Sequence, residues 1–172
     1  ALLQLDRAGA LDPQARIITG VSLGDMALHQ HVAADPRLWF TDVSQTHDIA
    51  AIARIPRFVA VNSAVEVDLF GQVNAERAAG ALQAGAGGLP AFAQGAQLSS
   101  GGRLLICLRA TASRGTISRI VPALDARGLC TLPRHLADAV ITEHGVAQLR
   151  GKSLDQRAAA LGSTGLQARR RE

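Results

Sequence analysis

Aromatic residues are scarce in this sequence. No tyrosine is present, and aromatic residues make up 3% of the 172 positions. Binders of single-stranded nucleic acid stack bases on such rings, so the scarcity argues against that class. The net charge of +4 does not reverse this, because much of it comes from the run 169–171 and from scattered arginines of the kind that cover a solvated surface. We therefore expect no nucleic-acid partner.

Cysteines and long apolar runs are also few. Cys107 and Cys130 are the only two cysteines. They form no CxxC pair and have no histidine at ligand spacing, so we expect buried free thiols in a reducing compartment. No apolar run approaches the roughly 18 residues of a membrane span, and the first residues lack the basic segment of a signal peptide. These features predict a cytoplasmic protein without membrane attachment.

The five histidines predict no metal site. His29 and His31 are two positions apart on a predicted helix and therefore do not share a face. The other three are isolated by spacing, and each is typical of a surface or hydrogen-bonded histidine.

Segments with strand and helix patterns alternate along the chain. This mixture predicts an α/β fold, an open mixed sheet flanked by helices. We expect strands at 16–21, 38–43, 104–108, 117–121, 129–132 and 139–142, and helices at 1–10, 25–33, 48–54, 89–98, 146–149 and 153–161. The apolar run 104–108 is typical of a strand covered on both faces, and Ser153 with Gln156 forms a capping box.

The segment 58–69 alternates valine and leucine with acidic residues before a Gly71-Gln72 turn, which predicts one arm of a β-hairpin. Glu66 and Asp68 fall on its polar face. The glycine-rich segment 80–88 predicts a loop, and its backbone N–H groups could approach an anion closely.

Five blocks of sequence then carry a family resemblance. FVAVNSAVEVDLFGQVNAE (58–76) resembles the central signature of the acetyl-CoA hydrolase/CoA-transferase family, which includes 4-hydroxybutyrate CoA-transferases. The blocks AGAGG (84–88), SSGGRLLICL (99–108), TISRIVPAL (116–124) and VITEHGVAQLRGKSLDQRA (140–158) resemble further family blocks in the same order. The resemblance spans residues 1–161 and is to the C-terminal CoA-transferase domain with its front truncated. The remaining residues, 162–172, form a divergent tail.

The resemblance implies covalent catalysis by a carboxylate. In such enzymes a glutamate attacks the acyl-CoA carbonyl, and the resulting glutamyl-CoA thioester passes CoA to a second acid or to water. Because residues 2–12 match the segment that follows the nucleophile, the resemblance implies that the nucleophile lies upstream of this chain.

Site residues follow from the same resemblance. Gly88 is implied as a backbone oxyanion donor, and Asn62, Val65, Gly87 and Gly88 as positions that line the CoA pocket. Glu66 is kept as a less favoured nucleophile, because its family position differs from that of the catalytic glutamate. The segment 89–92 reads Leu-Pro-Ala-Phe where the family has a more polar stretch.

Two functions remain open. The first is the C-terminal half of an acetyl-CoA hydrolase or CoA-transferase that is inactive alone, with acyl-CoA and a small carboxylate as substrates and no permanently bound cofactor. The alternative is a non-catalytic module that binds a separate N-terminal half or a second copy of itself.

Overall fold

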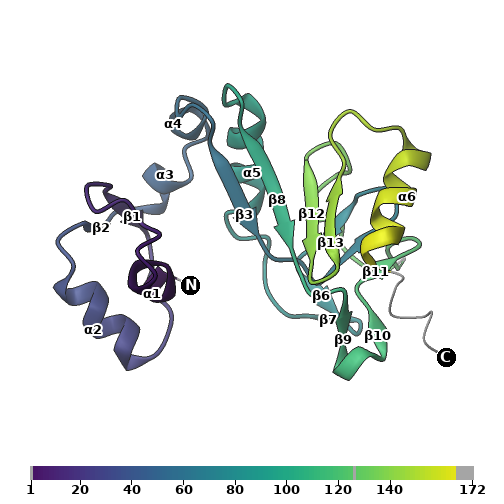
Figure 1. Ribbon diagram of the computed structural model, residues 1–172, viewed down its shortest axis with the longest axis horizontal. Helices are drawn as coiled ribbons and strands as arrows, with labels where there is room; N and C mark the ends of the chain where they lie inside the picture. The colour runs from purple at the N-terminus through teal and green to yellow at the C-terminus, as the bar shows by residue number, and fades with distance from the viewer. Residues whose placement is uncertain (1, 126, 166–172) are drawn as a thin grey trace. The chain divides into compact units, whose positions relative to one another are not determined.

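The structure is a computed structural model that describes residues 2–125 and 127–165 (Figure 1). The chain divides into two compact units. The first spans Ala1–Asp48 and the second begins at Ile49.

The first unit is a small strand–helix–strand motif. Its elements are α1 (Leu2–Arg7), β1 (Ile17–Thr19), α2 (Met26–Ala34), β2 (Leu38–Phe40) and α3 (Val43–Thr46). β1 and β2 pair in parallel, and α2 connects them. The Asp25 carboxylate accepts the Leu28 N–H at 2.9 Å and so caps α2, as the sequence predicts.

The second unit is built on a four-stranded sheet with the order β13-β12-β8-β3 (Figure 1). Its strands are β3 (Val59–Asn62), β8 (Arg103–Cys107), β12 (Ala139–Thr142) and β13 (Gly145–Gln148). The first three are parallel to one another, and β13 is antiparallel to β12. Helix α5 (Leu89–Leu98) packs on β3 and β8, and α6 (Leu154–Gly165) packs on β12 and β13. Helix α4 (Ile49–Ala53) lies against α5.

Smaller sheets surround one end of this unit. A three-stranded sheet has the order β11-β4-β5, with β4 (Glu66–Asp68), β5 (Val73–Asn74) and β11 (Ile120–Val121). Two further hairpins form separate two-stranded sheets. One pairs β6 (Arg77–Ala78) with β7 (Ala81–Leu82). The other pairs β9 (Thr111–Ala112) with β10 (Ile117–Ser118), which a 3-10 turn at Ser113–Gly115 connects.

One apolar core joins the four-stranded sheet to its helices. The sheet contributes Ala60, Leu104, Ile106, Val140 and Ala147, and the helices contribute Ala93, Ala96 and Leu161. Gly95 allows α5 to approach α4, because a Cβ atom at this position would overlap the Ile52 side chain. At the end of the sheet where β8 and β12 begin, the buried Asp138 carboxylate accepts two hydrogen bonds. One comes from the Leu104 N–H at 2.7 Å and the other from the Arg150 Nε–H at 2.5 Å.

The α/β class is confirmed, and several elements lie where the sequence predicts them. Helix α5 has the predicted bounds, with proline in its first turn. The capping box of α6 is present, since Ser153 N–H donates to Gln156 Oε1 at 3.0 Å and Gln156 N–H donates to Ser153 Oγ at 3.3 Å. Helix α6 continues to Gly165, so the predicted tail 162–172 begins within a helix, and its positions 166–172 lie outside the described residues.

Other element predictions are wrong. The segment 146–149 is strand β13 rather than a helix, because Gly145 at φ 147° closes a tight turn with β12. The arm 58–69 is two strands in different sheets, since the chain leaves β3 at Asn62 and pairs again only at Glu66. Its second part, β4, does form a hairpin with β5 across the predicted Gly71-Gln72 turn. The segment 117–121 likewise divides between β10 and β11, and 129–132 contributes only the isolated bridge from Leu132 to Val73.

Burial also corrects three expectations. Asp68 does not face solvent: it is fully buried and accepts the N–H groups of Phe70 and Gln72 within the β4–β5 turn. Cys130 is exposed rather than buried, and Cys107 is half-buried. Strand β8 is covered on one face only, because Arg103, Leu105 and Cys107 keep partial exposure while Leu104 and Ile106 are fully buried. Among the described residues, no helix has the length and apolar character needed to cross a membrane.

Candidate functional site

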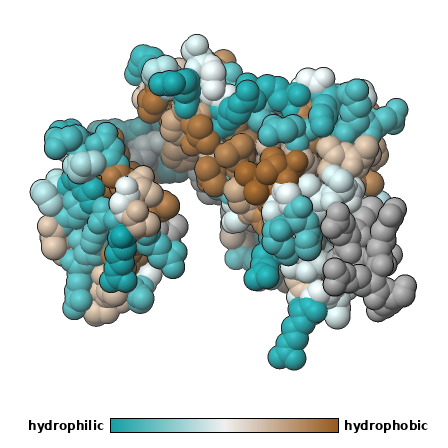
Figure 2. All heavy atoms as spheres, viewed as in Figure 1, coloured by the Kyte–Doolittle hydropathy of each residue, from teal (hydrophilic) through white to brown (hydrophobic). Residues whose placement is uncertain are grey.

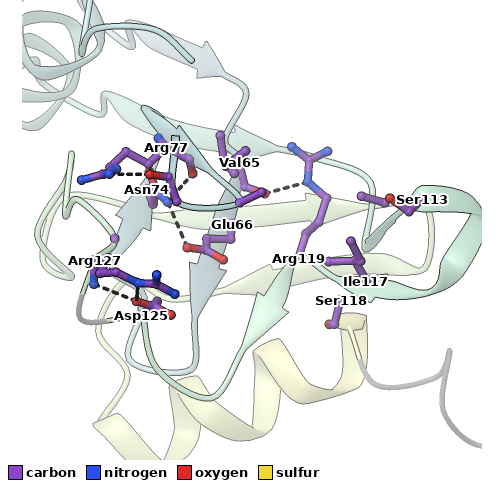
Figure 3. A pocket seen from close by; sticks show the side chains of 15 residues that line it. Val65, Glu66, Asn74, Arg77, Ser113, Ile117, Ser118, Arg119, Asp125 and Arg127 are labelled. Atoms are coloured by element: carbon purple, nitrogen blue, oxygen red, sulfur yellow. Dashed lines mark hydrogen bonds and ion pairs between the residues drawn. The ribbon is translucent and has the colours of Figure 1, made fainter. Parts of the chain in front are cut away.

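A pocket of about 600 Å³ opens beside β4 and β5 in the second unit (Figure 3). Its polar lining includes three arginines and two acids, so cationic side chains slightly outnumber anionic ones. The lining residues are Val65, Glu66, Asn74, Arg77, Ala78, Ala79, Gly80, Ala112, Ser113, Ile117, Ser118, Arg119, Asp125, Arg127 and Gly128. Such a lining suits a polar ligand that offers both hydrogen-bond donors and an anionic group.

The Glu66 carboxylate lies in this pocket between Asn74 and the Asp125–Arg127 pair (Figure 3). Glu66 Oε1 accepts the Nδ2–H of Asn74 at 2.9 Å. Asn74 is 1% exposed and is itself held, because its Nδ2 also donates to the Arg77 carbonyl while its Oδ1 accepts two backbone N–H groups. The carboxylate is therefore fixed in position by a buried amide.

Arg119 holds the turn between β3 and β4. Its Nε donates to the Val65 carbonyl at 2.6 Å, and its Nη2 donates to the Ala64 carbonyl at 2.5 Å. A planar guanidinium suits this two-point contact, which a lysine could not reproduce. The pocket wall that carries Val65 and leads into Glu66 is thus positioned by a side chain from a segment more than fifty residues away.

A second pocket, of about 270 Å³, lies along the edge strand β3 and beside the start of α5. It is lined by Asn62 at the end of β3 and by Leu89 and Phe92 of α5, together with Phe58, Val59, Ala60, Val61 and Leu104. Gly88 is the N-cap of α5. Within the described part of the chain, neither the Gly87 nor the Gly88 N–H donates to a protein acceptor. These donors lie at the positive end of the helix dipole, where an anion is favoured.

The sheet topology brings further polar residues close to the start of α5, at the edge where the parallel strands end. The parallel strands β3, β8 and β12 end at Asn62, Cys107 and Thr142, and open α/β sheets bind ligands outside such carboxyl ends. A crossover helix runs antiparallel to its strands, so α5 begins at this edge. Glu143 follows β12, and its Oε2 accepts the Ala110 N–H at 2.7 Å. This hydrogen bond is the main reason that the pKa of Glu143 lies below its ordinary value.

The structure therefore divides the predicted site residues. Val65 and Glu66 line the larger pocket, whereas Asn62 lines the smaller one. Gly87 and Gly88 line neither pocket, although Gly88 immediately precedes Leu89 of the smaller one. Sequence reasoning missed Asn74 and Glu143. The signal for Glu143 was present, because it is an acid directly after a buried parallel strand.

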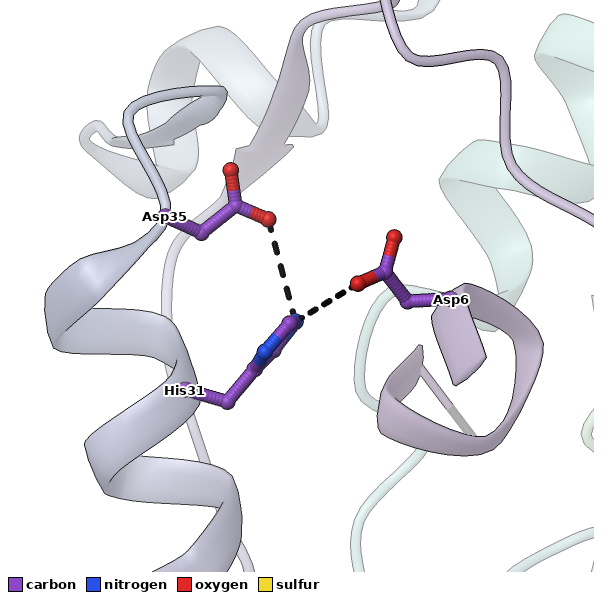
Figure 4. A group of neighbouring side chains, drawn as sticks. All are labelled: Asp6, His31 and Asp35. Carbon is purple, nitrogen blue, oxygen red and sulfur yellow. Dashed lines mark ion pairs between the residues drawn. The ribbon is translucent and has the colours of Figure 1, made fainter. Parts of the chain in front are cut away.

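The first unit holds a separate charged cluster of Asp6, His31 and Asp35 (Figure 4). His31 Nε2 lies 3.5 Å from Asp6 Oδ2 and 3.7 Å from Asp35 Oδ2. These groups could ligate a metal ion by type and spacing, but the Arg37 guanidinium already lies 2.6 Å from both carboxylates. Its hydrogen bonds lower the pKa of Asp35 to about 2. The cluster is an ion-pair network with its cation supplied by arginine.

Comparisons with known proteins agree on one family. The family model described as acetyl-CoA hydrolase/transferase C-terminal domain matches residues 24–165. A 4-hydroxybutyrate coenzyme A transferase of Clostridium kluyveri is 35% identical over 166 residues, which cover 93% of this chain and 39% of that protein. A butyryl-CoA:acetate CoA-transferase of Anaerostipes caccae is 38% identical over 141 residues, which cover 80% of this chain and 32% of that protein.

Solved structures give the same result. The crystal structure of RipA from Yersinia pestis superposes with a TM-score of 0.82 at 30% identity, covering 95% of this chain and 38% of RipA. A 4-hydroxybutyrate CoA-transferase from Porphyromonas gingivalis superposes with a TM-score of 0.75 at 30% identity, covering 95% of this chain and 39% of the other. The chain thus spans less than two fifths of the length of these relatives.

Proposed function

Because this chain belongs to the acetyl-CoA hydrolase/transferase family, whose C-terminal domain it matches, we propose that it forms the C-terminal half of an enzyme acting on acyl-CoA. The reaction is transfer of CoA to a second carboxylate, or hydrolysis of the thioester. A glutamate carboxylate attacks the acyl carbonyl carbon and expels the CoA thiolate, which leaves an acyl-glutamyl anhydride. The thiolate then attacks the glutamyl carbonyl carbon and releases the acid as its carboxylate. The resulting glutamyl-CoA thioester passes CoA to the acceptor acid by the reverse of these steps, or is hydrolysed by water. CoA is then a substrate and not a resident cofactor.

The observation that carries the proposal is the grouping of Asn62, Glu143 and the start of α5 at the carboxyl edge of three parallel strands. The free Gly88 N–H at the start of α5 suits an oxyanion that develops on a thioester carbonyl. Gly87 allows a close backbone approach, and Asn62 and Val65 line the path of the bound CoA. The edge supplies hydrogen-bond donors and a pocket wall.

The nucleophile in this proposal belongs to the part of the enzyme that precedes this domain. Glu66 is assigned to ligand contact, because its carboxylate is held by Asn74 in a pocket whose polar groups suit recognition. A direct test is mass spectrometry of the chain after incubation with acetyl-CoA. We expect no covalent adduct and no turnover by the chain alone. An adduct on Glu66 that disappears in Glu66→Gln would refute this assignment.

The oxyanion role of Gly88 is tested in a chimera in which this chain replaces the matching segment of the Clostridium kluyveri transferase. Gly88 has φ −81°, which proline also adopts, so Gly88→Pro deletes the N–H while keeping that angle. We expect kcat for CoA transfer to fall about 10²–10³-fold, the usual loss for one oxyanion donor. Gly88→Ala keeps the N–H and is the matched control. Equal losses in the two variants would exclude the oxyanion role.

A further inference from the structure

One face of the four-stranded sheet carries no helix of the second unit. The face that contacts α5 and α6 is closed, with Ala60 at 6% exposure and Leu104, Ile106 and Val140 at 0%. The opposite face is here called the open face; Arg103 and Gln148 lie at its margin, and its larger apolar residues are Val59, Val61, Leu105, Cys107, Ile141 and Val146. The three valines are 51%, 63% and 53% exposed, and the other three residues are half-buried.

These six residues form one continuous apolar surface. The strand register places Val61 beside Leu105, Cys107 beside Ile141, and Ile141 beside Val146, so the side chains are neighbours across all four strands. The surface view shows apolar side chains gathered over β3, β8 and β12 (Figure 2). Contiguous exposed apolar patches of this kind mark interaction sites, and sheets built from parallel strands are almost always covered on both faces.

The winding of the second unit explains why its own helices do not cover this face. The chain passes from β3 through α5 to β8 and then on to β12, always stepping in one direction across the sheet. Right-handed crossovers that step in one direction place their connections on one side. Helix α6 follows the β12–β13 hairpin and packs its Leu161 into the same core as α5. The open face can therefore be covered only by a segment that does not connect successive strands of this sheet.

We propose that the open face is the docking surface for the part of the CoA-transferase that precedes the C-terminal domain, whether on the same polypeptide or on a separate one. Three observations favour this occupant. The relatives extend far beyond the matched segment, which makes up 39% of the Clostridium kluyveri protein. None of the six apolar residues is charged, and Arg103, which the register places beside Val59, lies at the margin, as charged residues do in an interface with an apolar core. The face also meets the carboxyl edge at Cys107, where β8 ends, so a cover there lies beside the edge at which the proposed nucleophile acts. The inference rests on the proposed function for the identity of the occupant.

The two cysteines provide the test. Cys107 lies on the open face, whereas Cys130 is exposed after β11 and is not part of it. The probe is the portion of the Clostridium kluyveri transferase that precedes its C-terminal domain, expressed as a separate polypeptide and mixed with this chain. Alkylation is followed by mass spectrometry at alkaline pH, because burial raises the pKa of both thiols. When the probe occupies about 90% of the chains, we expect Cys107 to be alkylated about tenfold more slowly, because only the unbound tenth reacts. The alkylation rate of Cys130 should not change.

A pair of variants tests the same surface independently. Val59→Asp places a charge on the open face, at the end of β3 farthest from Asn62, and should abolish binding of the probe. Leu98→Asp alters a similarly exposed leucine of α5, 68% exposed and outside the open face, and should leave binding unchanged. Circular dichroism establishes that both variants fold. If Val59→Asp does not fold, the Cys107 protection of the unmodified chain decides the question.

The alternatives give different results. Failure of the probe to bind, or binding with Cys107 still reactive, overturns the proposed surface. If Cys107 is instead protected by self-association of the chain, the occupant is a second copy and the proposal is wrong. Restoration of CoA transfer in the mixture reports on the proposed function separately. Transfer with an unprotected Cys107 would leave that function standing while refuting the docking surface.

Discussion

The hydrogen bonds of Asn74 provide a quantitative test of how the larger pocket is built. This side chain is almost fully buried and makes four hydrogen bonds at 2.8–3.0 Å, one of them to the Glu66 carboxylate. Asn74→Ala removes all four. Each is worth about 1 kcal/mol net, and the half-buried Glu66 carboxylate, which lines the pocket, recovers water as a partner, so we expect the free energy of unfolding to fall by about 2–4 kcal/mol. Asn62→Ala, which removes a single contact to the Ser63 carbonyl, should cost well under half as much.

Asn74→Asp removes the side-chain N–H donor of Asn74 but keeps its acceptor oxygen, so it tests the two kinds of contact separately. The new carboxylate still accepts the two backbone N–H groups, but it faces the Glu66 carboxylate where the amide donated at 2.9 Å. Two like charges at this separation repel by up to about 6 kcal/mol at an effective dielectric constant near 20. The repulsion raises the pKa of one carboxyl in the folded state, so the protonated form is favoured there. The loss of stability is therefore largest at neutral pH and shrinks as the pH falls toward about 4.

Urea unfolding followed by far-UV circular dichroism at several pH values measures both effects. The single tryptophan, Trp39, lies in the first unit, so its fluorescence reports on that unit within the same samples. We expect the Asn74 variants to shift the dichroism transition. A cost below about 0.5 kcal/mol for Asn74→Ala, typical of an ordinary surface substitution, would refute the argument. A penalty for Asn74→Asp that does not change with pH would do the same.

Two further predictions concern packing and pH. Gly95→Ala should lower the free energy of unfolding by about 1–3 kcal/mol, because its Cβ overlaps the Ile52 side chain, and Ile52→Ala in the same chain should recover part of this loss in urea unfolding. Glu143 has a folded-state pKa below its ordinary value, chiefly through the Ala110 N–H, so it contributes stability that is full above the unfolded-state pKa and is lost as the pH falls through the folded-state pKa. Glu143→Gln should flatten the stability profile on the acidic side, and an unchanged profile would contradict this.

The parts of the fold that the sequence predicts well are those set by local chemistry. Helix α5 begins after two glycines with Pro90 in its first turn, and α6 begins at the Ser153–Gln156 capping box; both signals lie within a few residues of the helix start. The strands of the parallel sheet were likewise visible as apolar runs. Such features do not depend on what the segment packs against.

The wrong predictions depend on distant partners. The segment 58–69 alternates as one strand would, yet β3 pairs with β8 while β4 pairs with β5 and β11, so the sheet partners determine where it breaks. The segment 146–149 has a pattern that fits a short helix or a strand, and pairing with β12 decides for the strand. Periodicity over four residues cannot distinguish these outcomes.

The candidate site shows the same division. Glu66 and Gly88 stand within recognisable motifs, so the sequence alone predicts a role for them. The groups that position the site act across long separations: Asn74 reaches Glu66 over 8 residues, Glu143 reaches Ala110 over 33, and Arg119 reaches Val65 over 54. A single sequence contains no trace of these contacts, because the residue types involved are common on any surface.

The carboxyl edge and the open face predict separable defects. Gly88 acts through a backbone N–H at the start of α5, whereas Val59 lies on the open face at the opposite end of β3. A loss at Gly88 should therefore lower kcat in an assembled enzyme, whereas a charge at Val59 should mainly lower the fraction assembled. Val59 also lines the smaller pocket, which borders Leu89 beside Gly88, so the double variant tests whether the two effects are independent. Independent effects give a loss of transition-state stabilisation, from kcat, and a loss of binding free energy, from Kd, that each match the single variant within about 0.5 kcal/mol. A larger coupling energy would mean that cover of the open face also shapes the edge where the chemistry occurs.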